Sequence, residues 1–171
     1  MEYLEIEGGV PLEGKVEISG SKNATLPIMA ASLMASDEVV LHGVPDLEDV
    51  HVMADGLCLL GAKVKKEGHT LIIDSRTVDQ YTLPESLSRR MRASNLIMGA
   101  LLGKFKEARV AMPGGCAIGS RPMDQHLKGF AMLGYQVDAD KGVMTGSYKN
   151  SRGKRQVLLD FPSPRCCAAT A

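Results

Sequence analysis

A glycine-rich stretch around Cys116 carries the residue types best suited to chemistry. Residues 112–126 read MPGGCAIGSRPMDQH and lie between a predicted strand and a predicted helix. The glycines allow this loop to approach a ligand without Cβ clashes, and Arg121 with the free amides of a helix start would attract an anion. A thiol beside such groups has a lowered pKa, so Cys116 could donate or accept a proton. An ordinary turn with an incidental cysteine is the alternative interpretation.

Two further segments place cations immediately before predicted helices. Residues 19–23 read SGSKN, in which Lys22 offers a point charge and Asn23 an amide. Residues 89–94 read RRMRAS, and three neighbouring arginines would repel one another unless they shared an anion. For each segment alone, a solvated surface is the alternative. Together with the Cys116 loop they predict an electropositive cleft, formed by helix N-termini, for a small ligand with several negative charges.

Composition and motif content exclude several classes of protein. The 171 residues include 20 basic and 20 acidic side chains, and this zero net charge argues against a protein that coats nucleic acid. No apolar run approaches the ~20 residues that cross a bilayer, and the N-terminus lacks a signal-peptide pattern, so we expect a cytoplasmic protein without a membrane segment. The cysteines and histidines show no zinc-site spacing. Neither GxxxxGK[ST] nor GxGxxG is present, so the corresponding nucleotide-binding folds are not supported.

Hydrophobic periodicity predicts an α/β protein of short strands and amphipathic helices. With 44% hydrophobic residues, the chain can bury a core. Strands are predicted at residues 3–7, 15–18, 38–41, 63–64, 70–74, 108–112, 135–137, 142–145 and 156–160. Helices are predicted at residues 24–35, 46–60, 91–102 and 121–133, with Pro27 in the first turn of the first of them.

The predicted elements occur twice in the same order. Residues 60–64 read LGAKV and residues 133–137 read LGYQV, at an offset of 73. Each copy follows an amphipathic helix and precedes a hairpin. This indicates a repeated unit of about 70 residues, ordered helix, strand, helix, strand, strand. A chance match between two common helix-to-strand junctions is the alternative.

Three motifs together resemble one branch of a known enzyme family. Residues 19–28, 91–94 and 113–124 are similar, in order and in register, to the UDP-N-acetylglucosamine 1-carboxyvinyltransferase branch of the enolpyruvyl transferases. The resemblance implies an inside-out α/β barrel domain built from repeated helix-strand-helix-strand-strand units, incomplete here, with ligands bound between two such domains. It assigns residues 1–20 to strands of the second domain and residues 21–163 to about two of three repeats of the first. Residues 164–171 depart from the family as an aberrant tail.

The resemblance also implies an activity and site residues. Enolpyruvyl would pass from phosphoenolpyruvate to the 3-hydroxyl of UDP-N-acetylglucosamine with release of phosphate, the first committed step of peptidoglycan synthesis, without a metal or a cofactor. Cys116 would be the general acid that protonates the phosphoenolpyruvate methylene, and the thiol that fosfomycin alkylates. Lys22 would contact phosphoenolpyruvate and act in catalysis. The further substrate-binding residues would be Asn23, Arg92, Arg121, Pro122, Met123, Asp124, Gln125 and Ser163.

Other functions remain open at this point. The family's base and its phosphoenolpyruvate-clamping arginines match no residue of this sequence, so the free chain is predicted to be inactive. A fragment that binds a nucleotide sugar without catalysis is therefore one alternative. Enolpyruvyl-shikimate-phosphate synthase is a second, disfavoured because that relative lacks the loop cysteine. A non-enzymatic helical scaffold is a third, and it would not need a glycine-rich loop with Cys116.

Overall fold

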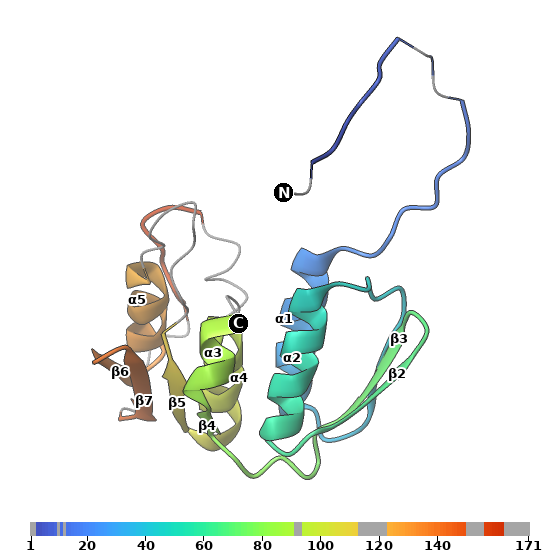
Figure 1. The fold of residues 1–171 in the computed structure, drawn as a ribbon. Coiled ribbons are helices and arrows are strands. Elements are labelled where there is room, and N and C mark those ends of the chain that lie inside the picture. The colour runs from blue at the N-terminus through green and yellow to red at the C-terminus, as the bar shows by residue number, and fades with distance from the viewer. Residues whose placement is uncertain are drawn as a thin grey trace.

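A computed structural model describes residues 3–9, 11, 13–90, 94–112, 123–149 and 156–162, with only the backbone described at 88–90. Within these residues the chain forms two sheets, one of three strands and one of four. Figure 1 shows helices packed between the two sheets. No helix in the described part of the chain is long and apolar enough to span a bilayer.

The first repeat unit consists of two helices and a small antiparallel sheet. Its elements are α1 (Lys22–Ala31), the 3-10 turn η1 (Ser32–Met34), β1 (Val39–Leu41), α2 (Glu48–Leu59), β2 (Lys63–Glu67) and β3 (Thr70–Asp74). The sheet has the order β1-β3-β2, so the last strand lies in the middle. Val50, Met53 and Leu57 are buried on α2, as the helical spacing of its apolar residues predicts.

The second unit repeats this arrangement and adds two elements. It consists of β4 (Thr82–Leu83), α3 (Glu85–Arg90), α4 (Ser94–Phe105), β5 (Glu107–Ala111), α5 (Asp124–Met132), β6 (Tyr135–Asp140) and β7 (Val143–Tyr148). The sheet order β4-β5-β7-β6 contains the first unit's pattern, with β4 added in parallel to β5. Neither β4 nor α3 is expected from the sequence, because a two-residue strand and a six-residue helix are too short to show periodicity.

The predicted repeat is confirmed by strand register. Leu71 pairs with Leu41 in the first sheet, and Met144 pairs with Val110 in the second. Leu71 and Met144 are related by the predicted offset, and both are buried. Each unit also turns from helix to strand through a glycine in the left-handed region, Gly61 at φ 101° and Gly134 at φ 91°. The match between residues 60–64 and 133–137 therefore marks a structural repeat.

The core lies where the helices of the two units meet. Helix α4 is apolar around most of its circumference, and its residues Ile97, Met98, Leu101 and Leu102 are buried. Gly146 on β7 makes room for this helix, since a Cβ there would lie 2.9 Å from Leu102 Cδ2 and 3.0 Å from Met98 Cε. The helix therefore packs closely on the second sheet.

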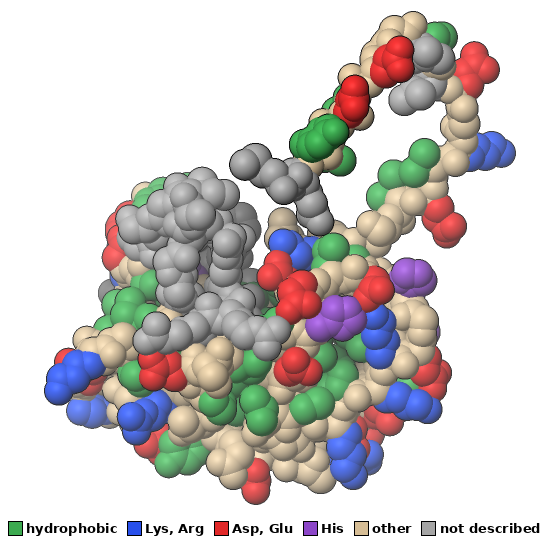
Figure 2. All heavy atoms as spheres, viewed as in Figure 1, with side chains coloured by type: hydrophobic (Ala, Val, Ile, Leu, Met, Phe, Trp, Pro, Cys, Tyr) green, Lys and Arg blue, Asp and Glu red, His purple; other side chains and the backbone are tan. Residues whose placement is uncertain are grey.

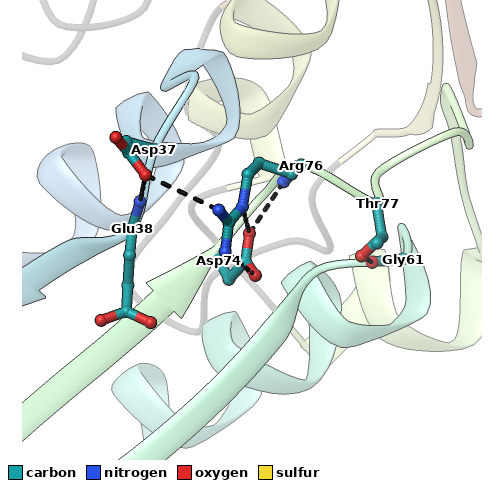
Figure 3. Close-up of polar contacts among 6 residues, drawn as sticks. All are labelled: Asp37, Glu38, Gly61, Asp74, Arg76 and Thr77. Atoms are coloured by element: carbon teal, nitrogen blue, oxygen red, sulfur yellow. Dashed lines mark hydrogen bonds and ion pairs between the residues drawn. The ribbon is translucent and has the colours of Figure 1, made fainter.

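The connection between the two units is held by polar contacts (Figure 3). The Arg76 guanidinium donates to both carboxylate oxygens of Asp74 at 2.9 Å, and the Arg76 backbone amide donates to Asp74 Oδ1. These bonds lower the pKa of Asp74 to about 2. The Thr77 hydroxyl donates to the Gly61 carbonyl at 2.7 Å. The chain leaving β3 is thereby fixed against the end of α2 before it enters β4.

Several predicted elements are wrong or displaced. Residues 3–7 and 15–18 are extended but pair with no strand among the described residues, and residues 156–160 likewise form no ladder. Alternating apolar residues favour a strand only if a sheet edge accepts them. Helix α1 begins at Lys22, so Pro27 lies in its second turn. The Ser21 side chain makes no capping hydrogen bond, and the Ser21 carbonyl accepts from the Ala24 and Thr25 amides instead.

Candidate active site

The predicted site residues divide into two groups in the structure. One group lies outside the described residues and comprises Arg92, Cys116, Arg121, Pro122 and Ser163. The described group comprises Lys22, Asn23, Met123, Asp124 and Gln125. All five of these lie at or next to the first turn of a helix, α1 for the first pair and α5 for the other three. Lys22 and Asn23, predicted to precede the helix, form its first residues, and the binding and catalytic roles of all five residues stay predictions.

Lys22 is paired with a carboxylate. Its Nζ lies 2.7 Å from Asp49 Oδ2, and both side chains are about two-fifths exposed, at 42% and 41%. Lys22 opens α1, and Asp49 lies in the first turn of α2, so the ion pair joins two neighbouring helix N-termini. A cation is disfavoured at a helix N-terminus and an anion is favoured, so Asp49 offsets the unfavourable position of Lys22. A ligand anion at Lys22 would have to share its ammonium with Asp49.

A buried polar pair joins the starts of α4 and α5. Asn95 Nδ2 donates to His126 Nε2 at 2.7 Å, and both residues are more than nine-tenths buried. With Nε2 accepting, the proton of the neutral imidazole is on Nδ1. That nitrogen and the Ser94 hydroxyl are buried and have no hydrogen-bond partner in the described part of the chain. Burial lowers the pKa of His126, and Asp124 partly opposes this, so the imidazole is neutral near pH 7.

Gln125 directs its side chain toward the segment at 156–162. Gln125 Nε2 donates to Asp160 Oδ2 at 2.9 Å, and Gln125 Oε1 accepts from the Asp160 amide at 3.0 Å. Lys128 also pairs with the Asp160 carboxylate. The bonds from Gln125 and Lys128 lower the pKa of Asp160. Because both ends of the Gln125 amide are occupied, a ligand would be contacted most readily by its backbone amide at the helix start.

The remaining predicted residues of α1 and α5 are accessible. Asn23 and Asp124 are exposed, and Met123 is half-buried at the N-cap position of α5. Figure 2 shows acidic, basic and histidine side chains on the face of the molecule that it draws. On α2 and its approach, Asp46 accepts from His51 and from Lys66. Lys22 and Lys66 are therefore each paired with a carboxylate, which the expected electropositive cleft did not include.

Sequence reasoning missed the groups that hold the site residues in place. Asp49, Asn95 and Asp160 were not singled out, although each bonds to a residue at a helix start. The available signal was weak: Asp49 follows Glu48 in a predicted first turn, where acids are common for electrostatic reasons alone. His126 ends the stretch that contains Cys116, and only its burial separates it from an ordinary surface histidine.

Comparison with known proteins agrees with this architecture. The fold is that of the enolpyruvyl transferases. An enolpyruvyl transferase, NikO from Streptomyces tendae, superimposes with a TM-score of 0.70 at 24% identity, covering 83% of this chain and 31% of that one. EPSP synthase from Acinetobacter baumannii gives a TM-score of 0.67 at 16% identity, covering 92% of this chain and 37% of that one. At these identities the likeness concerns the fold alone, and it confirms the predicted fold class.

Sequence comparison defines the family. The model of the family described as EPSP synthase (3-phosphoshikimate 1-carboxyvinyltransferase) matches residues 6–164, and the chain belongs to that family. Curated relatives named UDP-N-acetylglucosamine 1-carboxyvinyltransferase include one from Desulfatibacillum aliphaticivorans, 45% identical over 95% of this chain, and one from Chloroherpeton thalassium, 45% identical over 94%. The chain spans 39% and 38% of these relatives' lengths.

Proposed function

We propose that this chain forms part of an active site that transfers enolpyruvyl from phosphoenolpyruvate to the 3-hydroxyl of UDP-N-acetylglucosamine and releases phosphate. The observation that carries the proposal is 45% identity over 163 residues to a protein named for this carboxyvinyl transfer. Such identity favours a sugar nucleotide as acceptor over shikimate 3-phosphate, since the EPSP synthase structure is only 16% identical. The two proposed substrates are charged metabolites, and we propose that the reaction takes place in the cytoplasm. The proposal involves no metal, nucleic acid or membrane.

The proposed chemistry is an addition followed by an elimination. The sugar 3-hydroxyl gives its proton to a base outside this chain while its oxygen bonds to C2 of phosphoenolpyruvate, and the Cys116 thiol protonates C3, which gives a tetrahedral ketal. The C2–O bond to phosphate then breaks, C3 loses a proton, and the carbon–carbon double bond returns. Phosphate leaves with its bonding pair and takes up the proton that the sugar hydroxyl lost, and the Cys116 thiolate takes back the proton lost from C3. The balance needs neither an oxidant nor a cofactor.

The described residues support roles in binding two groups of anions. Lys22 would neutralise charge on phosphoenolpyruvate once its ammonium is shared with Asp49. Asp124 and Gln125 open α5, where backbone amides without helix partners favour an anionic or polar ligand. The other residues proposed to contact the substrates are Asn23, Arg92, Arg121, Pro122, Met123 and Ser163. In this proposal residues 1–20 belong to a second domain. The relatives are long enough to contain such a domain.

A chimera tests the activity directly. Residues 1–163 replace the corresponding part of a full-length curated relative, and phosphate release is measured with phosphoenolpyruvate and UDP-N-acetylglucosamine. We expect turnover that Cys116→Ser abolishes, and a mass increase on Cys116 when the chimera is treated with fosfomycin. Turnover with shikimate 3-phosphate but not with the sugar nucleotide would contradict the proposed acceptor.

Binding without catalysis is the second candidate function. It is favoured for the 171-residue chain by its share of the relatives' length, 39% in one and 38% in another. Calorimetric titration with UDP-N-acetylglucosamine, together with phosphate release by the same chain, separates the two functions. We expect weak binding and no turnover from the chain alone, and turnover close to that of a full-length relative would refute this expectation.

A further inference from the structure

The first sheet lacks a strand that the second sheet has. In the second sheet, β4 lies in parallel on the outer edge of β5, with Thr82 beside Arg109 and Leu83 beside Val110. The strand equivalent to β5 in the first sheet is β1, as the pairing of Leu41 with Leu71 shows. Strand β1 ends the order β1-β3-β2, so its outer edge carries no strand among the described residues.

Burial along the two equivalent strands differs accordingly. Ala108 and Val110 on β5 are buried, whereas Val39 and Leu41 at the matching positions of β1 are only half-buried. Val40 between them is 46% exposed. An open edge of this kind leaves backbone amides and carbonyls unpaired and favours pairing with another strand.

A segment with the pattern of a strand lies close by in sequence and has no partner. Residues 15–18 alternate charged and apolar side chains, and Val16 and Ile18 are 82% and 85% exposed. The segment extends away from the start of α1, at the blue end of the chain in Figure 1. Its apolar side chains therefore remain in contact with water.

The chain already touches the end of β1 at Gly20. A Cβ on Gly20 would lie 1.8 Å from the Gly43 carbonyl oxygen, so the two backbones meet there and only glycine fits. Gly43 follows Leu41 by two residues, and Gly20 follows Ile18 by two. Because extended chains rise about 3.3 Å per residue, two strands that run in parallel to this contact would place Ile18 beside Leu41.

We propose that residues 15–18 pair in parallel with the outer edge of β1, with Val16 beside Val39 and Ile18 beside Leu41. Ile18 then takes the place beside Leu41 that the buried Leu83 takes beside Val110. Rotation about Ser19 and Gly20 brings the segment to the edge, and the short connection gives it a high effective concentration there. The pairing is proposed for the 171-residue chain by itself and needs no ligand or activity. In a longer protein, β1 and a second domain would compete for these residues.

Amide hydrogen exchange by NMR on the 171-residue chain tests the pairing. We expect the amides of Val16, Ile18 and Val40, which face the partner strand in this register, to exchange at least about tenfold more slowly than those of residues 3–7. The double variant Val16→Asp with Ile18→Asp should lose this protection. The matched control, Leu4→Asp with Ile6→Asp, places the same charges in a segment that takes no part and should keep it. Gly20→Ala should also reduce protection, because its Cβ separates the two backbones.

Two results would overturn the proposal. One is exchange of the Val16 and Ile18 amides at the same rate as those of residues 3–7 in the unmodified chain. The other is protection that increases with protein concentration together with a dimer in sedimentation, because the edge of β1 would then be occupied by a second copy. Exchange is measured well below the temperature of unfolding, and circular dichroism of each variant checks that the fold is retained.

Discussion

Lys22 Nζ lies 2.7 Å from Asp49 Oδ2, so the cation proposed to meet phosphoenolpyruvate is already paired across two helix N-termini. The pair is two-fifths exposed, and such pairs contribute about 0–1 kcal/mol to stability. The ion pair therefore acts mainly by fixing the position of the Lys22 ammonium and by reducing the positive charge available to a ligand.

Replacing Lys22 should separate function from stability. Lys22→Met is expected to change the free energy of unfolding by less than about 1 kcal/mol, since both side chains of the ion pair are two-fifths exposed. In the chimera it should lower phosphate release by about 100-fold or more, since a charge at the reacting phosphoenolpyruvate is lost. Urea denaturation and phosphate release measure the two effects. Lys65→Met is the control, because Lys65 forms an exposed ion pair with Glu67 within β2. Equal loss of activity in both variants would argue against the role of Lys22.

The buried bond between Asn95 and His126 should matter for folding. Asn95→Leu leaves the His126 imidazole without its partner, and an unsatisfied buried polar group costs about 1–3 kcal/mol. Asn23→Leu removes an exposed amide and should change stability by less than about 0.5 kcal/mol. Chemical denaturation of both variants at pH 7.5 measures the difference, and similar midpoints would contradict it.

His126 should also make stability depend on pH. Its pKa is lowered in the folded chain by burial, so the unfolded chain binds a proton more readily. The stability that neutral His126 contributes is present above the unfolded pKa of about 6.5 and is lost as the pH falls through the folded value. His126→Phe should therefore reduce the slope of the unfolding free energy between pH 7 and the acid side of this range. An unchanged slope would assign the pH dependence to other groups.

Asp74 predicts a separate effect at strongly acid pH. Its pKa of about 2 is held down by Arg76, so the bond stabilises the fold above the usual pKa and is lost as the pH falls through about 2. Asp74→Asn should be less stable than the unmodified chain at pH 7 and equally stable near pH 2. Thermal unfolding across this range measures the convergence. Asp55→Asn, which makes the same substitution at an exposed position of α2, is the matched control.

The two bonds of Gln125 should hold the segment at 156–162 against α5. Gln125→Leu keeps the buried side chain's size but removes both bonds to Asp160. We expect faster proteolysis and amide exchange at residues 156–162, with little change elsewhere. Gln136→Leu is a suitable control, because the Gln136 side chain donates to Asp138 on the same strand, β6. Unchanged exchange at Asp160 would show that other contacts hold the segment.

The sequence by itself determined the elements whose signals are local. Helix α2 and the two hairpins follow from apolar spacing and from the turns at Gly61 and Gly134. The match between residues 60–64 and 133–137 indicated the repeat, and the motifs around Lys22 and Cys116 indicated the family. Such signals can be read without a partner, because they depend on neighbours within a few turns or strands.

Only the tertiary structure decided which residues meet. Each of three side-chain contacts joins residues that are far apart in the sequence. The separations are 27 residues for Lys22 and Asp49, 31 for Asn95 and His126, and 35 for Gln125 and Asp160. The same holds for strands: residues 82–83 pair because β5 offers an edge, while residues 15–18 carry a better alternating pattern and yet belong to no sheet that the structure describes. A strand is stabilised by hydrogen bonds to another segment, so its own residues cannot settle whether it forms.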